Sequence, residues 1–238
     1  MSAEIVVIEV PSIININEYN MLLSLVSKEK RSQINRFRLV KDAYRTLLGE
    51  ALIRTAIMSR LGVPNENIAF SYNEYGKPTL IGCEGLHFNV SHSGDWVVAF
   101  VSTAAVGIDV EEVRPIDMNI ASSYFAKEEY RELLAKSEGE RTAFFYELWT
   151  LKESYIKAKG EGLSIPLHSF SVAIQSDRTI TLKPEGENVY FKQYQLAPHY
   201  KMAACSFKNK FPLTVSHWSI EELLVQLSFD WSLRKIQP

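Results

Sequence analysis

Two carboxylates near the middle of the chain, Asp109 and Glu111, are spaced like side chains that share one face of a β-strand. Side chains alternate along a strand, so residues 106–111 (VGIDVE) put three branched apolar side chains on one face and Gly107 with the two carboxylates on the other. Such a pair can bind a hard cation, or it can be a solvated face, since acidic residues are mostly exposed. The bare glycine and the preceding SHSG turn at 91–94 favour a cation site, because they leave room for an anion and a metal.

A third carboxylate, Glu153, lies in the segment 142–159 (TAFFYELWTLKESYIKAK), whose apolar residues recur at helical spacing. Glu153 and Lys157 fall at the edge of the apolar face, from which side chains can point into a cleft. They are also an i,i+4 pair in the favoured order, which by itself predicts a surface salt bridge worth about 0.3–0.5 kcal/mol. Lys152 lies on the apolar side and can serve either the fold or a phosphate.

The sequence Tyr75, Gly76, Lys77, Pro78 is typical of a turn. Its glycine can adopt positive φ, and its proline holds the lysine extended. An extended lysine beside a glycine exposes backbone groups with which a flat ring could pair. An ordinary hairpin connection is the alternative.

Basic residues are concentrated upstream of this turn, in two segments with helical spacing. The segment 28–37 carries several of them, including Lys30, and Arg45 lies beside the apolar face of the segment 41–61. Gly62 after this second segment is a typical helix end. A solvated helix face is the alternative to an anion site here.

Short strands and helices in mixed order must position these residues. Apolar runs at 88–90, 96–101 and 106–110, separated by polar breaks, predict a small antiparallel meander. Further strands are expected at 5–10, 68–72, 170–174, 179–182, 190–196 and 202–207, and further helices at 119–125, 127–135 and 219–227. The similar order of elements in residues 1–104 and 105–238 permits two like halves, an N-terminal half and a C-terminal half with the metal site near their junction.

The composition is that of an ordinary globular chain. With 238 residues, 46% of them hydrophobic and 23% charged, it suffices for one large or two small domains. A net charge of −2 argues against general nucleic-acid binding, so an anion site must be a local patch. Only Cys83 and Cys205 are present, without metal-ligand spacing, which favours a reducing compartment. Without a signal-peptide pattern or a membrane-spanning run, a cytoplasmic protein is expected.

Taken together, these residue types indicate displacement at phosphorus. Mg²⁺ prefers oxygen ligands and often binds through carboxylates together with substrate phosphates. Lysines, and the His92 side chain in the predicted SHSG turn, would neutralise the remaining phosphate charge. Metal and cations would then stabilise the charge that develops on a leaving phosphate or pyrophosphate.

The chain resembles the Sfp-type 4′-phosphopantetheinyl transferases over nearly its full length. The resemblance is closest in four motifs: YGKP at 75–78, FNVSHS at 88–93, VGIDVE at 106–111 and FYELWTLKESYIK at 145–157. The joint occurrence of GIDVE and, some forty residues later, WxxKExxxK is highly specific. The match is close to the subgroup that serves peptide synthetases, and it does not place the tail after about Phe229.

This resemblance implies an α+β fold of two pseudo-symmetric halves, each a small antiparallel sheet packed with helices. The implied reaction is Mg²⁺-dependent transfer of the phosphopantetheine arm of coenzyme A to a serine of an apo peptidyl or acyl carrier protein, with release of adenosine 3′,5′-bisphosphate. A monomer that acts in nonribosomal peptide and antibiotic biosynthesis, without nucleic-acid or membrane partners, is expected by the same resemblance.

The resemblance also implies roles for individual residues. The expected Mg²⁺ ligands are Asp109, Glu111 and Glu153. The residues expected to bind the coenzyme are Lys157 at the pyrophosphate, Ser91 and His92 at its phosphates, Lys30 and Arg45 near the 3′-phosphate, and Tyr75, Gly76, Lys77 and Pro78 around the adenine. The expected catalytic residues are Asp109, Glu153 and Lys157. The base is expected to be Glu153 or a metal-held water; Glu129 is a weaker candidate, because its KEEY context equally suits an exposed helix start.

The segments 113–125 and 160–170 flank the expected site and are candidates for carrier docking. Their apolar residues could receive an acidic helix that bears the serine, or they could pack on their own domain. These residues are Met118, Phe125, Leu163 and Ile165.

Three other classes of protein compete with the transferase. A non-catalytic coenzyme A or carrier-binding module would not need three carboxylates, a metal-dependent phosphohydrolase would need more His and Asp ligands, and a structural protein would leave His92, Asp109 and Glu153 unexplained.

Overall fold

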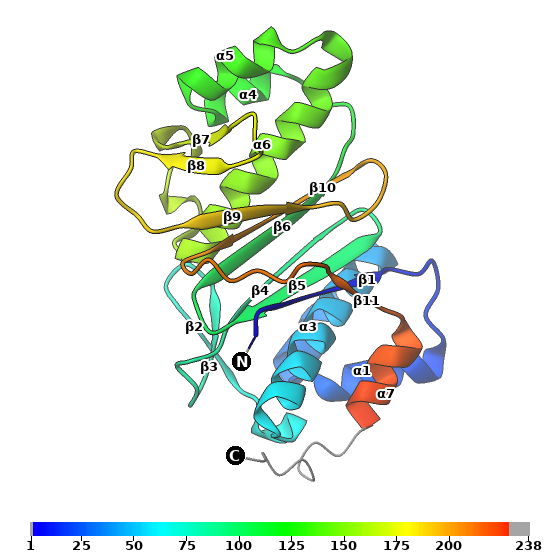
Figure 1. Ribbon diagram of the computed structural model, residues 1–238. Coiled ribbons are helices and arrows are strands. Elements are labelled where there is room, and N and C mark those ends of the chain that lie inside the picture. The colour runs from blue at the N-terminus through cyan, green and yellow to red at the C-terminus, as the bar shows by residue number, and fades with distance from the viewer. Residues whose placement is uncertain (1, 229–238) are drawn as a thin grey trace.

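The computed structural model describes residues 2–228 as an α+β protein in which small sheets are packed with helices (Figure 1). This confirms the expected fold class. The elements of residues 2–104 are β1 (Glu4–Glu9), α1 (Ile16–Leu25), α2 (Lys28–Ile34), α3 (Val40–Leu61), β2 (Phe70–Tyr72), β3 (Pro78–Leu80), β4 (His87–Ser93) and β5 (Trp96–Ser102). The later elements are β6 (Val106–Glu112), α4 (Asn119–Tyr124), α5 (Lys127–Ala135), α6 (Glu138–Lys159), β7 (Ser171–Ile174), β8 (Ile180–Lys183), β9 (Tyr190–Tyr194), β10 (Tyr200–Ser206), β11 (Ser216–Trp218) and α7 (Ile220–Ser228). The tail after Phe229 lies outside the described residues.

Two sheets form the centre of the molecule. The first has the strand order β11-β1-β5-β4 and the second β6-β10-β9, while β2-β3 and β7-β8 are separate hairpins. Each central sheet packs against a 22-residue helix, α3 on the first and α6 on the second (Figure 1). The helix α3 ends at Gly62, whose φ of 62° is left-handed, as its sequence predicts.

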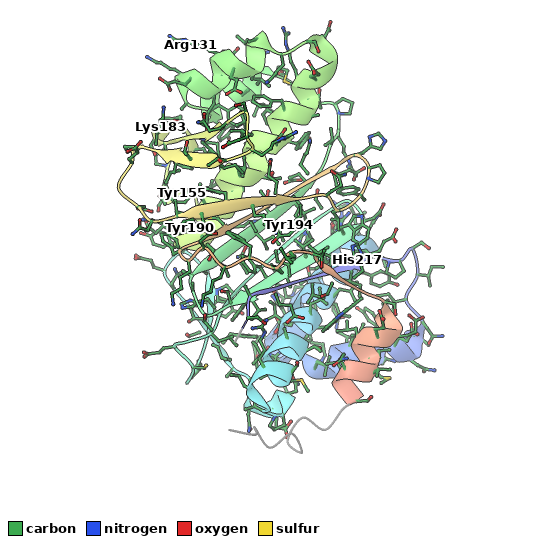
Figure 2. All side chains as sticks on the ribbon, in the orientation of Figure 1. Arg131, Tyr155, Lys183, Tyr190, Tyr194 and His217 are labelled. Atoms are coloured by element: carbon green, nitrogen blue, oxygen red, sulfur yellow. The ribbon has the colours of Figure 1, made fainter. Side chains whose placement is uncertain are left out.

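The last described elements return to the first sheet. Strand β11 pairs in parallel with β1, and Leu223 of α7 is buried in the same core as α3. Figure 2 shows His217 of β11 on the side of the molecule that holds α3, whereas Arg131 of α5 and Lys183 of β8 lie on the opposite side. The division into residues 1–104 and 105–238 stays a prediction, and we propose that residues 216–228 are attached to the first half.

The expected meander of three strands is wrong in its third member. Strands β4 and β5 pair in antiparallel fashion, but β6 pairs along its whole length with β10, almost a hundred residues away. Side chains of β4 connect the two sheets instead: Asn89 Oδ1 accepts from the amide of Ile108 (2.8 Å), and Ser93 Oγ from that of Glu112 (3.2 Å). Apolar runs and polar breaks specify strands but not their neighbours.

The space expected beside Gly107 is filled by α6. A β-carbon at Gly107 would overlap the carbonyl oxygen of Ser154 and the amide nitrogen of Ala158. The glycine therefore leaves no room for an anion. Its function is to let the helix backbone touch β6, which brings Glu153 and Lys157 next to the strand carboxylates.

Candidate active site

The two strand carboxylates lie on the opposite side of β6 from its apolar side chains. Val106, Ile108 and Val110 are fully buried in the core between the two sheets. Asp109 is 3% exposed, and Glu111 is half-buried. The predicted alternation is therefore confirmed, and the carboxylates are not a solvated face.

Lys157 reaches from α6 to the aspartate of β6. Its Nζ donates to Asp109 Oδ1 (2.5 Å) and to Ser91 Oγ (2.9 Å). Ser91 Oγ in turn donates to Asp109 Oδ1 (2.8 Å). The partner of Lys157 is thus Asp109, and not Glu153 as a surface salt bridge along the helix would require.

The three carboxylates influence one another. Burial raises the pKa of Glu111 and of Glu153, and the charge of Asp109 raises both further. Ser93 Oγ donates to Glu111 Oε2 (2.7 Å), which partly offsets this increase in the pKa of Glu111. Repulsion between carboxylates in a half-buried site favours a bound cation.

One oxygen of this site is suited to a metal. Asp109 Oδ2 is buried and has no hydrogen-bond partner within residues 2–228. A buried carboxylate oxygen without a partner is costly, and a divalent cation would satisfy it. No three acidic, histidine or cysteine side chains of the described part of the chain are arranged as a complete ligand set. The donors thus fit Mg²⁺ in their chemistry, and ligation by Asp109, Glu111 and Glu153 stays a prediction.

A cavity of about 270 Å³ brings together basic residues expected near the coenzyme phosphates. Lys30, Arg45 and His92 line it, beside Gly76 and Pro78 of the turn. Arg45 is fixed there, because its Nε and Nη2 donate to the carbonyl of Gly94 at 2.9 and 2.6 Å. Desolvation and the nearby Arg45 lower the pKa of His92, so the neutral imidazole is favoured.

Ser91 and His92 belong to strand β4 and not to a turn. The chain reverses at Gly94 and Asp95. Strand pairing with β5 extends to Ser93, so alternation sends Ser91 inward and His92 outward. Ser91 is 7% exposed and is hydrogen-bonded to Asp109 and Lys157, and its contact with a coenzyme phosphate remains a prediction.

A second cavity of about 300 Å³ adjoins α6. It is lined by Tyr75, Lys77, Glu153 and Lys157, and it shares Gly76 and Pro78 with the first cavity. The YGKP turn therefore lies between the basic residues and the carboxylates. This arrangement suits an elongated anion whose ends occupy different cavities.

The backbone of Lys77 is less free than the sequence suggested. Its amide donates to Asn73 Oδ1 (2.8 Å), and its carbonyl accepts from the amide of Asn73 (3.1 Å). Asn73 Oδ1 also accepts from the amide of Tyr75 (3.1 Å). An asparagine before a turn is a known signal for such bonds, so the sequence could have indicated Asn73. No comparable sequence pattern could have indicated Asn89, which lines the second cavity.

Glu129 is buried and not at an exposed helix start. It is 2% exposed, and its carboxylate accepts from Lys152 Nζ at 2.7 and 2.8 Å. Lys152 is fully buried and donates to the carbonyl of Phe170 as well (2.7 Å). The pair joins α5, α6 and the start of β7, so Lys152 serves the fold.

The candidate docking segments are only partly exposed. Leu163 is 73% exposed, but Phe125 is 3% exposed, and Met118 and Ile165 pack against buried clusters. Packing on their own domain, the alternative considered from the sequence, holds for these three. Tyr124, which sequence reasoning did not single out, is 42% exposed.

Three carboxylates, an ammonium group and two adjoining cavities with basic residues are chemically suited to a phosphorylated substrate. Residues 105–215 match the model of the 4′-phosphopantetheinyl transferase superfamily, and residues 15–104 match that of the 4′-phosphopantetheinyl transferase N-terminal region. The 4′-phosphopantetheinyl transferase Sfp of Bacillus subtilis is 43% identical over 87% of this chain and 93% of its own. The transferase gsp of Aneurinibacillus migulanus is 42% identical over 92% of this chain and 93% of its own.

The chain belongs to the Sfp-type 4′-phosphopantetheinyl transferases. It is therefore an enzyme that transfers phosphopantetheine from coenzyme A to carrier proteins, and the family resemblance noted in the sequence is confirmed. Within residues 2–228, no helix has both the length and the apolar character required to cross a membrane.

Proposed function

We propose that the carboxylate site and the two cavities form the active site of this transferase. In this proposal the coenzyme lies across the YGKP turn, with its 3′-phosphate near Lys30 and Arg45 and its pyrophosphate near His92 and Lys157. The observation that carries the proposal is that Gly76 and Pro78 of the turn line both cavities, so that residues far apart in the sequence border two cavities that meet at the turn.

The chain's own groups suit a displacement at phosphorus. The hydroxyl oxygen of the carrier serine attacks the β-phosphorus of coenzyme A, and the bond from this phosphorus to the bridging oxygen breaks. Glu153, which lines the second cavity beside Lys157, accepts the serine proton. Lys157, held by Asp109 and Ser91, neutralises charge on the departing adenosine 3′,5′-bisphosphate.

Asp109, Glu111 and Glu153 are the residues that would hold Mg²⁺, which when bound supplies positive charge against the pyrophosphate oxygens. The unpartnered Asp109 Oδ2 and the mutual repulsion of the carboxylates support this assignment. Lys157 contributes a second positive charge at the same place. Its contact with Asp109 keeps it within the site while the coenzyme enters.

The acceptor in this proposal is an apo peptidyl or acyl carrier domain, in a pathway of nonribosomal peptide or antibiotic synthesis. The exposed Leu163 borders the second cavity and offers an apolar contact to the carrier helix that bears the serine. We further propose a monomeric, cytoplasmic enzyme without nucleic-acid or membrane partners. The similarity to Sfp and gsp supports the acceptor class.

Intact-mass analysis tests the proposal. An apo peptidyl carrier domain is incubated with the enzyme, coenzyme A and Mg²⁺, with EDTA in a parallel sample. We expect the mass of one phosphopantetheine to be gained, and the gain to be lost with EDTA and reduced about 10²–10⁴-fold in rate by Glu153→Gln. Glu138→Gln, an exposed position on the first turn of α6, is the matched control. Undiminished transfer by Glu153→Gln would remove this residue from the active site, and coenzyme binding without any transfer would favour the non-catalytic module.

A further inference from the structure

The side chain of Lys77 ends at the last turn of α6, where its ammonium group meets backbone carbonyls. Its Nζ donates to the carbonyls of Lys157 (2.6 Å), Ala158 (2.9 Å) and Val106 (3.4 Å). The last carbonyls of a helix lack partners within the helix, so a buried ammonium group there satisfies them. Its three donors are thus used inside the protein.

Asn73 makes a parallel connection from the same turn. Its Nδ2 donates to the carbonyl of Gly160 (2.7 Å), the residue that ends α6. Gly160 has a left-handed φ of 79°, and a β-carbon there would press against the stem of Lys77. We call the Asn73 and Lys77 side chains, with the carbonyls that they bind at the end of α6, the latch.

The latch joins the turn to α6, whereas the strands of the turn's hairpin are anchored elsewhere, since Leu80 is buried in the core of α3 and Phe70 packs against that core. The turn is the loop of the hairpin β2-β3, whose strands have three residues each and which forms a sheet of its own. A two-stranded hairpin is at best marginally stable alone. The turn's position relative to α6 therefore depends strongly on the latch.

The helix end that the latch holds carries reacting groups. Lys77 binds the backbone carbonyl of Lys157, the residue whose side chain contacts Asp109. Glu153 lies one helical turn earlier and lines the same cavity as the turn. Movement of the turn relative to this helix would change the distance between an adenine ring on the turn and the groups that act on the pyrophosphate.

We propose that the latch couples adenine binding to catalysis, and that Lys77 is a positioning residue whose side chain is not a ligand of the coenzyme. The inference rests on the proposed function, in which the YGKP turn holds the adenine. Binding energy from a remote part of a substrate raises the rate only if the remote part and the reacting part are held in one geometry. Burial lowers the pKa of Lys77 to about 8, so assays near pH 6.5 keep the ammonium protonated.

The test compares two donors, coenzyme A and an abasic coenzyme A in which hydrogen replaces the adenine. Both release the same kind of bisphosphate, so the ratio of their kcat/KM values measures the advantage that the adenine gives. The variants are Lys77→Met, which keeps the stem and removes the ammonium, and Asn73→Asp, which keeps the acceptor that shapes the turn but removes the donor to Gly160. Lys210→Met, at an exposed lysine, is the control.

For the wild type and Lys210→Met we expect coenzyme A to be preferred. Lys77→Met should lower kcat/KM for coenzyme A by about 10–100-fold, because the hydrogen bonds of a charged group are lost. For the abasic donor, kcat/KM should change by less than about threefold. Asn73→Asp should reduce the donor ratio in the same direction, which provides a second test if Lys77→Met folds poorly.

An equal loss with both donors would show that Lys77 only supports the fold, and an unchanged donor ratio in both variants would refute the coupling. A wild type that transfers normally but uses both donors equally well would refute the adenine-holding turn and the latch with it. A wild type that transfers from neither donor would instead refute the proposed function.

Discussion

The buried Lys152–Glu129 pair gives the sharpest test of which residues serve the fold and which serve the reaction. Lys152→Met replaces the ammonium by an apolar group of similar length. Among the described residues, it leaves the buried carboxylate of Glu129 with the amides of Ala126 (2.8 Å) and Val172 (2.7 Å) as its remaining donors. Removing one partner of a buried ion pair typically costs about 3–5 kcal/mol, and we expect this loss in the free energy of unfolding.

The double variant decides whether this loss belongs to the pair. With Glu129→Gln added, both charges are gone, and the glutamine oxygen can still accept from one of the two amides. We therefore expect the double variant to be destabilised by at least about 1 kcal/mol less than the sum of the two single variants. Urea unfolding of the four proteins measures this difference. Additive effects, or single losses below about 1 kcal/mol, would refute the assignment of the pair to the fold.

Transfer activity of the same variants tests the rival role of Glu129 as the base. Its carboxylate is occupied by Lys152 and two backbone amides, so we expect folded Glu129→Gln to keep transfer within about tenfold of the wild type. Loss of a general base would lower the rate about 10²–10⁴-fold. A fall of that size in a protein shown to be folded would restore Glu129 as a catalytic candidate.

Three further predictions concern the site and the stability of the fold. Asp109→Ala should nearly abolish transfer while leaving the protein folded, and unchanged turnover in the mass assay would refute the metal and lysine assignments. Gly107→Ala should cost at least about 2 kcal/mol in urea unfolding, because the new methyl group meets the backbone of α6; a neutral effect would contradict that close contact. Lys159 donates to Glu187 and lowers the pKa of this carboxyl group below the ordinary 4.5. The pair therefore stabilises the fold above about pH 4.5. This stabilisation is lost as the pH falls through the lower pKa that Glu187 has in the folded state. Because the pair is partly exposed, Glu187→Gln should cost only about 0.5 kcal/mol at pH 7, and a gap to the wild type that persists at pH 2.5 would refute this reasoning.

The sequence alone determined the local elements and the chemistry of the site. Period-two alternation placed Asp109 and Glu111 on one face of β6, and helical spacing placed Glu153 and Lys157 on α6. These inferences succeed because side-chain direction within one strand or helix follows from its backbone geometry. The motifs in the same elements were specific enough to indicate the transferase family by themselves.

The tertiary structure decided which of these groups meet. It paired β6 with β10 and not with β5, placed Lys157 on Asp109 and not on Glu153, and filled the space beside Gly107 with helix. It also buried Glu129 and sent the Lys77 side chain inward to α6. Each of these outcomes involves residues at least 23 positions apart, and for Lys157 the distant partner Asp109 displaced the local partner Glu153. Local periodicity says which way a side chain points along its own element, but only the packing of the elements determines what it meets there.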